Sequence, residues 1–244
     1  MKQITSKSAK MFIGAMLMAG AAVVARGVMS WGSGQHVWVL YLAVLAVVAS
    51  RLRVTLPGIN GSMSVNLPFI LLAVSRLSFS EAVLIAGLST VAQSLPRKGG
   101  QFNWVQASFN TSNIVLAAAL GFWASHAGVL MRSKVWDNAF VPVVACLTYF
   151  LVQTFPVAGV ISLTENKNAV HVWREIAVLS FPYFVLSAGV AGMAVVAMHH
   201  VSWSVPAVAL TLMYFVYRSY SRYFRFVVIA PQVENRAMAA AGAR

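Results

Sequence analysis

Eight apolar segments, separated by short polar or basic turns, make up most of this 244-residue chain. Their lengths and spacing predict an all-α protein: a polytopic transmembrane helical bundle of about eight segments, with six as the lower bound. The expected segments are 11–31, 38–50, 64–76, 80–95, 105–126, 139–162, 176–198 and 203–217. They form one expected membrane domain, 1–226, followed by a short cytoplasmic tail, 227–244, which we expect to be disordered.

The third and fourth segments, 64–76 and 80–95, are short for membrane spans. A hydrocarbon core of about 30 Å needs about 20 helical residues. Two arrangements therefore stay open for this pair, either burial among other helices or a re-entrant hairpin. The stretch before them, 54–63, holds a Pro-Gly and an Asn-Gly dipeptide and is expected to be a turn.

Composition agrees with a membrane protein. Hydrophobic residues make up 59% of the chain and charged residues only 9%, whereas soluble domains carry about a quarter charged residues. We attribute the net charge of +13 to Lys and Arg in loops that face anionic lipid. Nucleic-acid binding is not expected, because no aromatic-basic RNA motif accompanies the charge.

The basic residues also predict an orientation. With the N-terminus in the cytoplasm and eight alternating segments, twelve Lys and Arg residues fall inside and four outside. We therefore expect a multi-pass protein of the bacterial inner membrane with both termini in the cytoplasm. The inner set is Lys2, Lys7, Lys10, Arg51, Arg53, Arg97, Lys98, Lys167, Arg174, Arg218, Arg222 and Arg225, and the outer set is Arg26, Arg76, Arg132 and Lys134.

Amide side chains at or within the apolar segments are the main candidates for binding. Unpaired polar groups cost roughly 1–3 kcal/mol each when buried, so these residues need partners. They either form hydrogen bonds between helices or line a polar pocket for a small ligand or lipid. Three of them, at 106, 110 and 113, share one helix face. The full candidate set is Asn66, Gln93, Gln106, Asn110, Asn113 and Gln153.

Two further features suggest function. Arg76 and Glu81 flank the turn between the short segments, and they either pair at the outer surface or act as a charged gate. Ala15 and Ala19 on the first segment have the small-x-x-x-small spacing that lets another helix approach closely.

Catalytic and metal-binding patterns are missing from the sequence. It contains no G-x-S-x-G, H-E-x-x-H or Walker motif, and its one close histidine pair, His199 and His200, is adjacent and unsuited to joint ligation. Five acidic residues, scattered along the chain, are too few for typical Mg²⁺-dependent lipid transferases. We therefore expect no enzyme activity, no metal and no cofactor.

The stretch LRVTLPGINGSMSVNLPFILLAVSRLSFSEAVLIAGLSTVAQSL, followed by FNTSNIVLAAALGF, resembles a bacterial membrane sensor module. Such modules are commonly fused to GGDEF or HD-GYP domains, and the resemblance covers about residues 50–200. The pattern is also similar to the substrate-binding component of energy-coupling-factor transporters, where small residues on an early helix dock the partner. No GGDEF or HD signature follows Phe226, so the resemblance implies a module that signals through a partner.

The sequence thus predicts a non-enzymatic membrane module that binds a small ligand or lipid and passes the signal to a cytoplasmic protein. Two alternatives stay open: a membrane component of a small-molecule transporter, and an accessory subunit packed against a larger membrane complex.

Overall fold

The computed structural model describes residues 7–32, 36–55, 62–96, 102–127, 140–198 and 204–241. In these ranges the chain forms eight helices and two short strands, which confirms the expected all-α class. The helices are α1 (Lys7–Met29), α2 (His36–Ser50), α3 (Leu67–Arg76), α4 (Phe79–Ser94), α5 (Trp104–Ser125), α7 (Phe140–Glu165), α8 (Ala169–Ala197) and α9 (Ser204–Ala241). Three of them, α1, α7 and α8, are long and apolar enough to cross a membrane. These helices fit a membrane protein.

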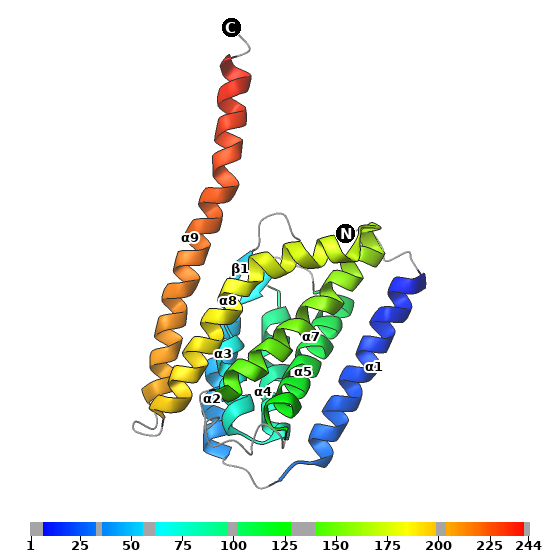
Figure 1. Cartoon of the computed structure of the whole chain (residues 1–244), viewed down its shortest axis with the longest axis vertical. Coiled ribbons are helices and arrows are strands. Elements are labelled where there is room, and N and C mark those ends of the chain that lie inside the picture. The colour runs from blue at the N-terminus through cyan, green and yellow to red at the C-terminus, as the bar shows by residue number, and fades with distance from the viewer. Residues whose placement is uncertain are drawn as a thin grey trace.

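Successive helices run in alternating directions between two ends of a bundle (Figure 1). The antiparallel pairing of α4 with α5 is set by Phe79, whose ring lies 5.6 Å from that of Phe122, and by Gly87, which faces Val115. We call one end of the bundle the basic end; it holds the start of α1, the ends of α2 and α4, and the α7–α8 turn. The opposite end, where Arg76 donates a hydrogen bond to the Val195 carbonyl, is called the far end.

Helix α3 lies in the middle of the bundle and contacts α2, α4, α5, α7 and α8. Every residue from Leu67 to Val74 is buried. Its ten residues span only about 15 Å, which is too short to cross a hydrocarbon core of about 30 Å. This helix corresponds to the expected short segment 64–76, and it is buried among the other helices. Other helices surround α3 on all sides from Leu67 to Val74. A helix buried on every side needs no polar face, and the apolar sequence of this stretch agrees with that.

A small hairpin precedes α3, where the sequence suggested only a turn. Strand β1 (Arg53–Thr55) pairs antiparallel with β2 (Ser62–Ser64), and Arg53 lies opposite Ser64. The β-branched pair Val54 and Thr55 favours the extended backbone. Residues 56–61, with the Pro-Gly dipeptide, lie outside the described residues.

Local hydrogen bonds fix both the end of α7 and the start of α8 at the turn between them. Asn166 adopts a left-handed backbone, with φ of 53°, and the Lys167 amide donates to the Ser162 carbonyl, which is the bond of a Schellman helix end. The Asn168 side chain then accepts from the amides of Val170 and His171 and caps α8. Because of this cap, α8 begins at Ala169, seven residues before the expected start at 176.

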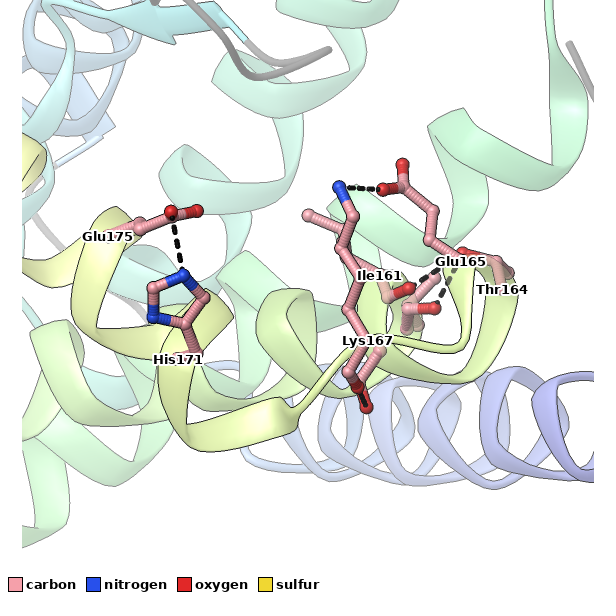
Figure 2. Close-up of polar contacts among 8 residues, drawn as sticks. Ile161, Thr164, Glu165, Lys167, His171 and Glu175 are labelled. Carbon is pink, nitrogen blue, oxygen red and sulfur yellow. Dashed lines mark hydrogen bonds and ion pairs between the residues drawn. The ribbon is translucent and has the colours of Figure 1, made fainter.

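An ion pair and a histidine–carboxylate contact lie at this turn (Figure 2). The Lys167 ammonium lies 2.6 Å from a Glu165 carboxylate oxygen, and the His171 Nε2 lies 3.2 Å from Glu175. The hydrogen bond from Lys167 to Glu165, together with the negative charge of Glu165, raises the pKa of Lys167 above its usual value. Both pairs are exposed, so their contribution to stability is small.

Helix α9 is the longest helix described, with 38 residues, and extends about 57 Å at 1.5 Å per residue. It leaves the far end, passes the hairpin and continues well beyond the bundle (Figure 1). The segment expected to be a disordered tail is helical as far as Ala241. The run AMAAA at 237–241 is rich in strong helix formers, which favours helix in the last turn of α9.

Candidate functional site

A buried polar network lies where the hairpin meets α3 and α4. The Ser64 hydroxyl lies 2.7 Å from the Asn66 side-chain oxygen and 2.8 Å from the Gln93 side-chain oxygen. The Asn66 amide nitrogen donates to the Ser89 hydroxyl at 3.1 Å. We call Ser64, Asn66, Ser89 and Gln93 the hairpin network. It brings together two of the six predicted amides, Asn66 and Gln93, through a serine that the prediction did not include.

Within the hairpin network, the Ser64 hydroxyl has fewer hydrogens than there are amide oxygens facing it. A serine hydroxyl carries one hydrogen, yet the Ser64 hydroxyl faces two amide oxygens. Turning the Gln93 amide by 180° lets its nitrogen donate to Ser64, but its own oxygen is then left for another donor. Gln93 is half-buried, while Asn66 and Ser64 are buried. In the first orientation, one of the two amide oxygens facing Ser64 receives no hydrogen from it.

Tyr183 of α8 locks the backbone beside this network. Its hydroxyl donates to the Ser64 carbonyl at 2.8 Å and accepts from the Leu67 amide at 3.3 Å. The Leu67 amide is at the start of α3, where helix N–H groups have no partner within the helix. Tyr183 therefore satisfies two buried backbone groups and holds the hairpin against α8.

Replacing Tyr183 with phenylalanine should lower the free energy of unfolding by about 2 kcal/mol, because two buried backbone groups lose their partner. Thermal unfolding of the purified protein in detergent measures the change. Tyr149→Phe is the matched control, since Tyr149 is equally buried and no described residue forms a hydrogen bond with its hydroxyl. Equal losses in the two variants would show that the Tyr183 hydroxyl does not hold the hairpin.

A second polar contact joins α5 and α7. The Asn113 side-chain nitrogen donates to the main-chain carbonyl of Gln153 at 2.9 Å. That carbonyl lies three residues before Pro156, which is inside α7 and, lacking an N–H, disrupts the hydrogen bonds of the preceding turn. The Asn113 amide thus supports α7 at its proline. The Asn113 side-chain oxygen is buried and has no hydrogen-bond partner among the described residues.

The six predicted amides therefore do not form one described hydrogen-bond network. Asn66 and Gln93 belong to the hairpin network, whereas Asn113 and Gln153 meet between α5 and α7 through the Gln153 backbone. Asn110 is half-buried one turn before Asn113, and Gln106 is exposed near the start of α5. Their role in binding stays a prediction.

Arg76 and Glu81 do not pair with each other in the structure. Glu81 accepts hydrogen bonds from the amide and hydroxyl of Ser78 and closes a capping box at the start of α4. Arg76 donates to the Val195 carbonyl in the last turn of α8. Of the two alternatives left open by the sequence, pairing across the turn does not occur, because Arg76 and Glu81 each bond at a helix end instead. Their action as a charged gate stays a prediction.

Two more arginines follow the same pattern at the basic end. Arg51 donates to the Ala92 carbonyl at 2.8 Å, and Arg53 donates to the Leu95 carbonyl at 2.9 Å. Both carbonyls lie at the end of α4, where helix C=O groups lack partners and the helix dipole favours a cation. Helix ends thus serve as partners for arginines in a chain with few carboxylates.

The small residues of α1 fall on two faces. Ala15 and Ala19 are exposed, so they do not pack within the described bundle. The inward face holds Ala9, Ile13, Gly20, Val23 and Gly27. At Gly20 the helix approaches α5 so closely that a β-carbon would lie 2.5 Å from the Ser112 Cβ. Sequence spacing alone did not distinguish these faces, although both have small residues.

No group of three His, Cys, Asp or Glu side chains that could hold a metal ion occurs among the described residues. The hydroxyls of Ser64, Ser89 and Tyr183 are the site residues that sequence reasoning missed. Each stands in or beside an apolar stretch, which was the available signal. No family model matches the chain, and no curated protein or solved structure gives a match.

Proposed function

We propose that this protein is a non-enzymatic integral membrane module that binds a small ligand at the hairpin network and transmits binding to a cytoplasmic partner through α9. The observation that carries the proposal is that the Ser64 hydroxyl, with its single hydrogen, faces two amide oxygens. A ligand that brings an N–H or O–H group would satisfy the amide oxygen that Ser64 leaves unpaired. Such a ligand is preferred over an anion, because the network offers acceptors.

The hairpin is also the element that links the network to α9. Helix α9 contacts β1, α2 and α8, and β2 supplies Ser64 to the network. A shift of Ser64 on ligand binding would move β1 through their paired backbones and so reach α9. Because α9 is one continuous helix that projects beyond the bundle (Figure 1), a displacement at its base would be carried to its projecting end.

The orientation in the membrane is proposed from the charges. The exposed side chains of Lys7, Lys10, Arg51, Lys167 and Arg174 belong to elements that meet at the basic end, whereas Arg26 and Arg76 lie toward the far end. Cytoplasmic loops carry the excess of Lys and Arg. The basic end would therefore face the cytoplasm of a bacterial inner membrane, with eight alternating segments and both chain ends inside.

The proposal is tested by mass spectrometry of small molecules released from the purified full-length protein. We expect a compound with hydrogen-bond donors to accompany the wild type and to be lost from Gln93→Leu. Ser108→Leu, at an exposed polar position of α5 outside the network and outside the candidate amides, is the control and should retain it. A compound retained equally by Gln93→Leu, or the absence of any compound from the wild type, would contradict the proposed binding.

One observation favours the accessory subunit as a second candidate. Ala15 and Ala19 present a small-residue face of α1 outward, away from the described bundle. Close helix–helix approach in membranes uses such faces. If the protein docks on a larger complex there, Ala15→Leu with Ala19→Leu should abolish co-purification of the partner in mild detergent while leaving thermal stability unchanged.

A further inference from the structure

Arg218 and Arg222 form a pair of like charges on α9. They are four residues apart, so they lie one turn apart on the same side of the helix, and both are exposed. Like charges at this spacing destabilise an isolated helix. The sequence has no acidic residue between Glu175 and Glu234, so no carboxylate on the neighbouring turns of α9 offsets the two charges.

The other described carboxylates are engaged elsewhere. Glu81 caps α4 through Ser78, Glu165 holds Lys167 and Glu175 faces His171. Among the described residues, no ion pair reaches Arg218 or Arg222. The two guanidinium groups thus offer a doubly positive surface to something outside the chain.

The position of the pair along α9 indicates what that surface meets. Exposed apolar side chains precede it, with Val208 65%, Leu212 43% and Phe215 62% exposed, and Tyr223, 64% exposed, follows it. An apolar face that gives way to arginine and tyrosine is typical of the level where acyl chains meet headgroups. The pair therefore lies where lipid phosphates are found.

We propose that Arg218 and Arg222 together bind the phosphate of an anionic phospholipid. Guanidinium groups match phosphate oxygens with paired N–H donors. Two cations favour a lipid with net negative charge, because the phosphate of a zwitterionic lipid is already neutralised by its own ammonium group. This inference is independent of the proposed ligand at the hairpin network.

Native mass spectrometry of the full-length protein in detergent, titrated with phosphatidylglycerol or phosphatidylcholine, tests the proposal. R218Q/R222Q should bind phosphatidylglycerol roughly tenfold more weakly than the wild type, since each basic residue near an anionic surface contributes appreciably to attraction. Phosphatidylcholine binding should not change. R26Q removes an exposed arginine from α1, toward the far end, and should retain wild-type phosphatidylglycerol binding.

R218K/R222K keeps both charges but loses the planar donors, and it should bind phosphatidylglycerol with an affinity between those of the wild type and R218Q/R222Q. Displacement of the lipid by millimolar inorganic phosphate would overturn the proposal in favour of a free-phosphate site. Equal phosphatidylglycerol binding by the wild type and R218Q/R222Q, at matched melting temperatures, would overturn it outright, as would an equal loss in R26Q.

Discussion

Asn113→Asp should destabilise the protein by about 3 kcal/mol or more at neutral pH, because it places a carboxylate against a carbonyl in a buried site. Asn113 is 2% exposed, and its side-chain nitrogen donates to the Gln153 carbonyl. Aspartate has nearly the same shape but, when ionised, offers only acceptors. The contact that supports α7 beside Pro156 would become a repulsion between oxygens.

The loss should depend on pH. Burial disfavours the ionised form and raises the pKa of the introduced carboxyl above the value of about 4 in an unfolded chain. The folded state then binds protons more tightly, so the variant is most stable below that unfolded pKa, where a carboxylic acid O–H can donate to Gln153. Stability falls as pH rises through the folded pKa.

Thermal unfolding in detergent between pH 4 and pH 8 measures both effects. Asn110→Asp is the control, since Asn110 lies on the same helix but is half-buried, and its loss should be smaller and less dependent on pH. A variant Asn113→Asp as stable as the wild type at pH 8 would show that the amide donor at this position does not support α7.

Gly20→Ala should cost about 3 kcal/mol, at the upper end of the usual penalty for overpacking. The added β-carbon would lie 2.5 Å from the Ser112 Cβ and 2.8 Å from the Ser112 Cα. The second of these atoms belongs to the backbone of α5 and has no rotamer to change. To accept one methyl group, α1 must move away from α5, which is one of its main contacts in the bundle.

Gly14→Ala is the matched control for this substitution. Gly14 lies on the same helix, and a β-carbon there meets nothing within 4 Å. Alanine at such a site should be neutral or stabilise by about 0.4–1 kcal/mol, because it restricts the unfolded chain. A melting temperature of Gly20→Ala as high as that of Gly14→Ala would contradict the close approach of α1 and α5.

Much of the fold follows from the periodic apolar pattern. The expected segments 64–76 and 80–95 correspond to α3, Leu67–Arg76, and α4, Phe79–Ser94. The features that the apolar pattern did not predict, the early start of α8 and the hairpin, depend on hydrogen bonds to the local backbone. The cap at Asn168 extends α8 into a polar stretch, and the pairing of Arg53 with Ser64 turns part of a loop into strands. Neither effect changes hydrophobicity, so a hydropathy pattern does not reveal it.

The candidate site was harder to read from sequence than the fold. Serine and threonine in helices commonly bond to the carbonyl four residues earlier, as Ser75 does to Leu71 and Thr90 does to Ala86. Ser89 also bonds back to its helix, at the Ala86 carbonyl, and only the three-dimensional packing reveals that it accepts from the Asn66 amide as well. The amides themselves were identifiable, because an amide in an apolar helix needs a partner, but their choice of partner depends on which helices are neighbours.

The pairing of Arg51, Arg53 and Arg76 with main-chain carbonyls has a consequence for acid tolerance. Guanidinium groups stay protonated throughout the physiological range, and a peptide carbonyl does not titrate at all there. Acid denaturation proceeds chiefly by protonating carboxylates that the native state has paired, and these three contacts contain none. These three contacts, which connect α4 and α8 to other parts of the bundle, should therefore persist at acidic pH values that protonate the carboxylates of ordinary ion pairs.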